Sequence, residues 1–242
     1  MNIIIVSNYF FPEIGAAPNR IFHLAKGLKS NNHQVDVVCP LPNYPKGKIL
    51  HEYRGRVFKK ECIDGIKTFR YWIYPSVSSN TLIRIFSMIS FALSSWFYGF
   101  NLKRIKNADW IIIQNSPLLV SFSSVMLFKY IFRKRIALNI SDLWPLSALE
   151  LGAIRKGIFY SLLQWIERFN YNNADLIIGQ SQEIIEHTKS FVNKPSFLYR
   201  NIQPNQDKNY ILIKDANIQR VKLIYAGLLG VAQGVYEIVS NV

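Results

Sequence analysis

Three segments of the chain hold residues that could bind or activate a substrate, and each directly follows an apolar run. They are 7–17 with Gly15 and Ala16, Asn115-Ser116-Pro117, and 141–145 with Asp142. The Asp142 carboxylate could accept a proton from a substrate hydroxyl, and capping of a helix is the alternative role. Glu150 could bind substrate hydroxyls, although a surface glutamate is the simpler interpretation. Asp142 is therefore the candidate catalytic residue.

The elements that must position these residues alternate between strand and helix. Apolar runs predict strands at 3–7, 35–39, 57–62, 66–73, 109–113, 135–140 and 176–179. Apolar residues at helical spacing predict helices over about 18–30 and around 159–169. Asp64-Gly65, between two of the runs, is a strong hairpin signal. This order predicts an α/β fold with a doubly wound, mostly parallel, Rossmann-like sheet.

The segment 7–17 is predicted to lie at the carboxyl ends of the strands, where open α/β sheets bind ligands. Its one glycine, Gly15, does not make the G-x-G-x-x-G pattern, which counts against a nicotinamide or flavin enzyme. A helix that begins after a turn of small residues can still bind a phosphate through its exposed N–H groups and its dipole. An ordinary loop is the alternative interpretation.

The charge of the chain favours an anionic partner. The 242 residues include 29 Lys and Arg and 15 Asp and Glu, which gives a formal net charge of +14. Phosphate groups, an acidic membrane or nucleic acid would fit this charge, but no recognised nucleic-acid motif accompanies it. Met1 leads straight into a strand, and Cys39 and Cys62 form no C-x-x-C pair, so we expect no signal peptide and a reducing cytoplasm. The histidines lack metal-ligand spacing, so no metal site is predicted.

Two apolar segments bordered by cations, 85–100 and 118–132, could contact a membrane. The first is shorter than the roughly 20 residues of a typical spanning helix. Shallow insertion at an anionic leaflet is favoured for such segments, burial as crossover helices is the alternative, and a spanning helix is the minority interpretation. The residues expected to touch lipid are Phe86, Phe91, Trp96, Phe97, Lys103, Arg104 and Lys106.

Several motifs together resemble family 4 of the retaining glycosyltransferases, which have the GT-B fold. The matching stretches are Pro12-Glu13-Ile14-Gly15-Ala16 with Arg20, His33-Gln34-Val35, Leu41-Pro42-Asn43-Tyr44-Pro45, Ser141-Asp142-Leu143-Trp144-Pro145 with Leu151-Gly152, Glu167 with Ala174-Asp175-Leu176-Ile177-Ile178 and Ser181, and 225–234. They keep the family order and span nearly the whole chain. The subgroup that the chain resembles most transfers N-acetyl-fucosamine-type amino sugars in O-antigen and capsule synthesis.

The resemblance implies a nucleotide diphosphate sugar as donor, a polyprenyl-diphosphate-linked saccharide as acceptor, and no required metal or other cofactor. Together with the loops above, it gives the expected donor or acceptor contacts: Gly15, Ala16, Arg20, Asn43, Tyr44, Ser116, Glu150, Gly227, Gly230 and Gln233. Gly15-Ala16 stands where the family often has Gly-Gly. Leu228 and Gln233 stand where many members have basic residues that hold the leaving diphosphate.

The resemblance also divides the chain. Residues 1–200 are expected to form the N-terminal, acceptor-side domain, 201–219 a polar linker, and 220–242 the start of a C-terminal domain that binds the nucleotide sugar. The rest of that domain, with the family's E-x7-E segment, does not follow. We therefore expect a truncated form that alone transfers no sugar at an appreciable rate.

The leading interpretation is the acceptor-side half of a glycosyltransferase in surface polysaccharide biosynthesis. It is expected to be cytoplasmic and peripheral on the inner face of the cytoplasmic membrane. The alternatives are a non-catalytic anchoring subunit of a split glycosyltransferase, a GT-B sugar epimerase and, with little support, a nucleic-acid binder.

Overall fold

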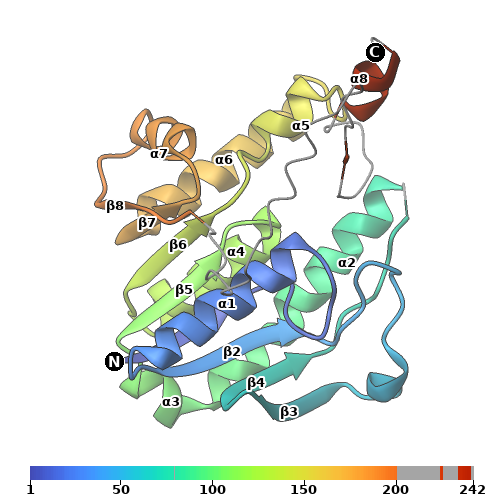
Figure 1. Ribbon diagram of the computed structural model, residues 1–242. Helices are drawn as coiled ribbons and strands as arrows, with labels where there is room; N and C mark the ends of the chain where they lie inside the picture. The colour runs from blue at the N-terminus through green and yellow to red at the C-terminus, as the bar shows by residue number, and fades with distance from the viewer. Residues whose placement is uncertain (79, 201–223, 226–233, 241–242) are drawn as a thin grey trace, which may run out of the picture.

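Eight strands form one sheet, with seven of them parallel (Figure 1). This computed structural model describes residues 1–78, 80–200, 224–225 and 234–240. The strands are β1 (Asn2–Val6), β2 (Gln34–Pro40), β3 (Phe58–Ile63), β4 (Ile66–Tyr71), β5 (Trp110–Gln114), β6 (Ile136–Ile140), β7 (Leu176–Gly179) and β8 (Ser196–Leu198). Their order in the sheet is β3-β4-β2-β1-β5-β6-β7-β8, and β3 is antiparallel to β4. The predicted α/β class with a doubly wound, mostly parallel sheet is confirmed.

Helices cover both faces of this sheet. The helices of the described residues, not all of which lie on the sheet, are α1 (Ala16–Ser30), α2 (Thr81–Ser94), α3 (Leu102–Asn107), α4 (Leu118–Val125), α5 (Leu146–Glu150), α6 (Ile158–Asn173), α7 (Gln182–Lys189) and α8 (Val235–Ser240). Shorter turns are the 3₁₀ segments η1 (His51–Tyr53) and η2 (Ser95–Phe100) and the π-helical η3 (Met126–Ile131). Helix α1 packs on one face, through Ile21 and Ala25. Segments α2 to α4 supply much of the core on the other face (Figure 1).

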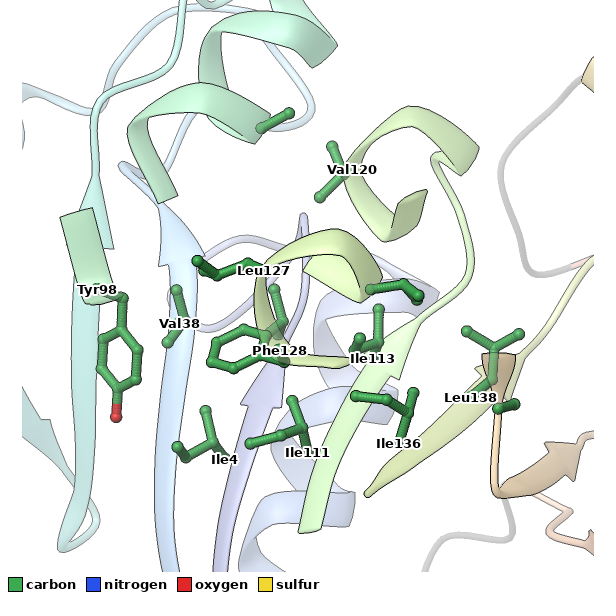
Figure 2. Packing of buried hydrophobic residues seen from close by; sticks show 14 of the residues in the cluster. Ile4, Val38, Tyr98, Ile111, Ile113, Val120, Leu127, Phe128, Ile136 and Leu138 are labelled. Atoms are coloured by element: carbon green, nitrogen blue, oxygen red, sulfur yellow. The ribbon is translucent and has the colours of Figure 1, made fainter. Parts of the chain in front are cut away.

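The central strands are apolar on both sides because both faces are covered. Ile4 and Ile111 point into the larger core shown in Figure 2, together with Phe128 from η3. Their neighbours Ile5 and Ile112 point to the opposite face, towards α1. Side chains of successive strand residues alternate in direction, so a strand buried on both faces has a continuous apolar sequence. This explains why the runs at the central strands were recognisable.

The predicted hairpin is confirmed. Strands β3 and β4 pair antiparallel from Phe58↔Tyr71 to Ile63↔Ile66. Asp64 and Gly65 between them have φ values of 48° and 74°. Two consecutive positive φ angles match the right-handed twist of the flanking strands, and Asp-Gly is a preferred sequence for them.

The apolar segment 118–132 does not lie on the surface as an inserting helix. It forms α4 and η3 in the connection between β5 and β6, and Val120, Val125 and Phe128 are buried in the core. The expected membrane contact of this segment is therefore wrong, and the alternative of a buried crossover helix is correct.

The other apolar segment, 85–100, lies within the helical stretch Thr81–Phe100, which is at the surface and has two different faces. One face is in the core through Phe91 and Tyr98, both fully buried, so the predicted lipid contact of Phe91 is wrong. The opposite face carries exposed apolar side chains at helical spacing, which we name the apolar stripe: Leu82, Phe86, Ile89, Leu93, Phe97 and Phe100. By length and composition alone, this 20-residue stretch, with a mean hydropathy of 1.3, would suffice to cross a bilayer.

The basic residues after this segment also differ from one another. Lys103 and Lys106 are exposed, whereas Arg104 is half-buried and its guanidinium donates to Asp36 at 2.6 Å. Arg104 is therefore not a free cation of the surface as predicted. Trp96 is partly exposed, but its indole N–H donates to Ser123 at 2.7 Å, which fixes the ring to α4.

The predicted linker and most of the predicted second domain lie outside the described residues. The linker, 201–219, is entirely outside. From 220–242, only Ile224, Tyr225 and 234–240 are described, the last of which includes α8. The predicted donor contacts Gly227, Gly230 and Gln233 also lie outside the described residues.

Candidate active site at the carboxyl edge of the sheet

The predicted site residues in the described part of the chain lie on or near loops at one edge of the sheet. Strands β1, β2, β5, β6 and β7 run parallel, so their carboxyl ends share this edge. The loops that leave it begin at Ser7, Leu41, Asn115, Ser141 and Gln180. The edge thus collects polar and small residues that are far apart in the sequence, as expected for a ligand site in an open α/β sheet.

Glu13 ties two of these loops together. Its side chain is 3% exposed, and its Oε1 accepts hydrogen bonds from the backbone N–H groups of Asn43 (2.8 Å) and Tyr44 (2.9 Å). Its Oε2 accepts from the N–H of Phe10 at 3.2 Å. Burial raises the pKa of Glu13, and the three N–H groups oppose that rise. The sequence suggested no such role, because the amides come from the loop after β2, about thirty residues away.

Gly15 makes the turn at which α1 begins. It has φ 149° and ψ 175°, and an added Cβ would lie 2.9 Å from Cε1 of Tyr44. The Tyr44 ring is held in turn by an edge contact with Tyr9, at 5.3 Å between centroids. No side chain caps α1, so the exposed Ala16 starts a helix whose first N–H groups have no side-chain partner. Such a helix start can accept an anion.

A row of polar side chains lies on the face of the sheet that α1 covers. Ser7 Oγ donates to Gln114 Oε1, and Arg20 from α1 donates to Gln180 Oε1 at 2.7 Å. Within the described chain, Oδ1 of Asn139 is buried without a hydrogen-bond partner, as is Oδ1 of Asn8. Buried polar atoms normally have partners, so these two oxygens are candidate acceptors for a bound water or ligand hydroxyl.

Asp142 is exposed at the end of β6 and accepts a hydrogen bond from the hydroxyl of Ser141 at 3.0 Å. The next helix, α5, starts after Pro145 and has no side-chain cap. The alternative role of Asp142 as a helix cap is therefore not supported. Desolvation lowers the pKa of Arg20, while the charge of Asp142 acts in the opposite direction. The charge of Asp142 thus favours the ionised form of Arg20.

Three other residues predicted to contact the donor or the acceptor, Asn43, Ser116 and Glu150, form fewer interactions with the rest of the site. The Asn43 side chain donates to Leu41 O at 3.0 Å, so it fixes its own turn. Ser116 is half-buried after β5, and Glu150 is exposed at the end of α5. Within the described residues, neither side chain forms a hydrogen bond or ion pair with the others. No group of three or more His, Cys, Asp or Glu side chains in this part of the chain could hold a metal ion.

Arg70 on β4 holds the loop that follows β1 in place. The sequence did not suggest this role. It is fully buried on β4, pairs with Glu61 of β3, and donates to the carbonyl oxygen of Phe11. Although burial opposes ionisation of Glu61, hydrogen bonds from Arg70 and Lys59 hold its pKa below the usual range. Phe11 lies two residues before Glu13. Arg70 thus connects the hairpin to the turn at Gly15.

Comparisons with known proteins identify the fold. No family model and no curated protein matches the sequence. A sucrose-phosphate synthase from Thermosynechococcus elongatus is similar in structure, with a TM-score of 0.56 and 12% identity over 82% of this chain and 47% of that one. The catalytic domain of starch synthase IV from Arabidopsis thaliana, bound to ADP and acarbose, has a TM-score of 0.51 and 11% identity over 81% and 51%.

A third similar structure is apo UGT2 from Phytolacca americana, with a TM-score of 0.52 and 12% identity over 84% of this chain and 52% of that one. The chain thus spans about half the length of these three solved proteins. The likeness shows that the sheet is the Rossmann-like half of a GT-B fold. The N-terminal GT-B half expected from the sequence is confirmed as a fold.

Proposed function

We propose that this chain is the acceptor-side half of a glycosyltransferase that moves a sugar from a nucleotide diphosphate sugar to a hydroxyl. The observation that carries the proposal is the turn at Gly15. Buried Glu13 accepts from the backbone of the loop that carries Tyr44, the Tyr44 ring packs against the turn, and no side chain caps the start of α1 at this carboxyl edge of the sheet. Arg20 and Asp142 lie at the same edge, and their charges interact. In this proposal, the same edge of the sheet binds the donor diphosphate and supplies a carboxylate that acts on the acceptor hydroxyl.

Each residue has a role in this proposal. The backbone N–H groups at the start of α1, beside Gly15 and Ala16, bind the donor diphosphate, because the start of a helix favours negative charge. Arg20 supplies a positive charge near the same group. Asp142 orients or deprotonates the acceptor hydroxyl. The family resemblance suggests family 4 of the retaining enzymes, a polyprenyl-diphosphate-linked acceptor in O-antigen or capsule synthesis, and no metal requirement.

The direct test uses an enzyme in which this chain is joined to a nucleotide-sugar-binding half. It is incubated with a panel of nucleotide diphosphate sugars and a polyprenyl-diphosphate-linked saccharide, and products are identified by mass spectrometry. Transfer to the saccharide is the expected result. Conversion of the free nucleotide sugar without transfer would indicate an epimerase and contradict the proposal.

Asp142→Asn keeps the shape of the side chain and removes its charge. If Asp142 acts on the acceptor hydroxyl, kcat for transfer in the joined enzyme should fall by about 10²-fold or more. The unfolding midpoint should stay unchanged, because the carboxylate caps no helix. Asp64→Asn, an exposed change at the β3–β4 turn, is the control and should leave kcat as it was. Near-wild-type turnover by Asp142→Asn would remove Asp142 from the catalytic residues.

The same proposal places the protein on the cytoplasmic face of an anionic membrane through the apolar stripe. Soluble proteins rarely expose a large continuous apolar patch without a partner. The stretch from Ile85 to Leu102 contains no charged residue, and Lys103 and Lys106 lie just after it. An apolar helix face bordered by cations is typical of helices that lie in the membrane interface.

Removing two rings of the stripe should release the protein from lipid. The double variant Phe86→Ser with Phe97→Ser should bind vesicles of phosphatidylcholine and phosphatidylglycerol about tenfold less tightly per ring, because each buried phenylalanine contributes about 1.5–3 kcal/mol. Sedimentation with vesicles measures this. Phe197→Ser on β8, similarly exposed but away from the stripe, is the control. Unchanged sedimentation of the double variant would contradict the membrane contact.

A further inference from the structure

A cavity of about 510 Å³ lies at the opposite edge of the sheet from the candidate active site. It is bounded by the amino ends of β1, β2 and β4 and by the connection from η2 to α3, and its lining includes Gln34, Asp36, Lys67, Phe100 and Lys103. Figure 1 shows α3 at this edge, far from α5. A cavity of this volume is within the range of small-molecule sites. The glycosyl-transfer proposal makes no use of it.

The cavity has an excess of positive charge. Arg104 also lines it, but its charge is balanced by Asp36, whose Oδ2 accepts from Arg104 at 2.6 Å and from Tyr98 at 3.1 Å. Lys67 and Lys103 form no ion pair with the rest of the described chain. Two lysine charges therefore remain available to an anion, and the carboxylate that could compete with that anion is already paired.

Two exposed apolar side chains also line the cavity. Phe100, 81% exposed, is the last member of the apolar stripe, and Leu102, 51% exposed, follows it. A free inorganic anion would gain nothing from these side chains. A phosphate that carries an alkyl chain would use both features, with its charge at the lysines and its chain along Phe100 and the stripe.

We propose that this cavity binds the phosphate headgroup of an anionic lipid and so fixes how the protein lies on the membrane. The inference rests on the membrane contact proposed above. Lys67 comes from the sheet and Lys103 from α3, so a bound phosphate would connect the body of the domain to the end of the surface helix. With the headgroup in place, the stripe lies along the acyl layer, and the carboxyl edge of the sheet remains free for substrates.

The test titrates the full chain with a monomeric short-chain phosphatidylglycerol, followed by calorimetry. This lipid should bind at least tenfold more tightly than the matching phosphatidylcholine and than inorganic phosphate. Lys67→Gln and Lys103→Gln should each weaken its binding about fivefold, the effect of one cation near an anionic lipid surface. Lys189→Gln, the same change on the exposed end of α7, should leave the affinity unchanged within twofold.

The outcomes separate this site from the membrane contact. If Phe86→Ser with Phe97→Ser no longer sediments with vesicles but still binds the short-chain lipid, the cavity is a lipid-phosphate site in its own right. Inorganic phosphate that binds as tightly as the lipid would make it a free-anion site and overturn the lipid assignment. Equal weakening by Lys189→Gln and Lys67→Gln would show a general charge effect and overturn the site. Circular dichroism checks the fold of each variant.

Discussion

Gly15→Val should reduce sugar transfer by the joined enzyme by about 10²-fold or more while the domain stays folded, because displacements of about 1 Å can cost that much. Two effects act together at this position. The φ of 149° lies in a region that β-branched residues avoid, and the new Cβ would meet the Tyr44 ring at 2.9 Å. The turn must move, and with it the first N–H groups of α1. Steady-state transfer rates measure the loss of activity, and the thermal midpoint of unfolding tests whether the domain stays folded.

Three further variants separate the effect of backbone strain from that of the contact with the Tyr44 ring. Gly55 also has a positive φ, 73°, but an added Cβ there would contact nothing within 4 Å, so Gly55→Val tests backbone strain away from the site. It should leave transfer near the wild-type rate. Gly15→Ala should be partly rescued by Tyr44→Ala, which removes the ring that the new Cβ meets. Full activity of Gly15→Val would show that the turn does not contact the donor.

The sheet could be predicted from the sequence because a strand that is buried on both faces has a continuous run of apolar residues. Runs such as Ile3-Ile4-Ile5-Val6 need apolar partners on both sides, and only a covered parallel sheet supplies them. The Asp64-Gly65 turn is equally local, because its two positive φ angles depend on those residues alone. Such features depend on neighbours in sequence.

The errors concerned features that depend on distant neighbours. Segments 85–100 and 118–132 are similar in composition, yet only the first has an exposed apolar face. Which side of a helix is buried depends on the elements that cover it, so Phe91 and Phe86 could not be told apart from the sequence. The roles of Glu13 and of Asn43 depend on how two loops meet across the sheet.

Arg70 is a case in which a local signal was present and was not used. Once the Asp64-Gly65 turn sets the register, Arg70 lies opposite Lys59 and diagonal to Glu61. A cross-strand pair of opposite charge follows from this register. Its burial does not, because that depends on the loop from β1 covering the guanidinium through the carbonyl of Phe11.

Arg70→Met should lower the free energy of unfolding of the chain by about 3–5 kcal/mol, measured by urea denaturation. The change leaves the Glu61 carboxylate without its main partner and the Phe11 carbonyl without its donor. The double variant Arg70→Met with Glu61→Gln should recover a large part of this loss, because no buried carboxylate is then left without Arg70, and Lys59, which also loses Glu61, is partly exposed to solvent. As a control, Lys26→Met removes an exposed ion pair with Asp64 and should cost at most about 1 kcal/mol.

The pH dependence identifies the charge on Glu61 as the cause. A carboxyl group whose pKa is lowered on folding stabilises the protein above its unfolded pKa of about 4.3, and this contribution is lost as the pH falls through the lower folded value. The difference in unfolding free energy between wild type and Arg70→Met should therefore be largest near neutral pH and shrink below about pH 4. A difference that stays constant down to acid would mean that Arg70 acts through packing alone. In that case the connection from the hairpin to the Gly15 turn would not be electrostatic.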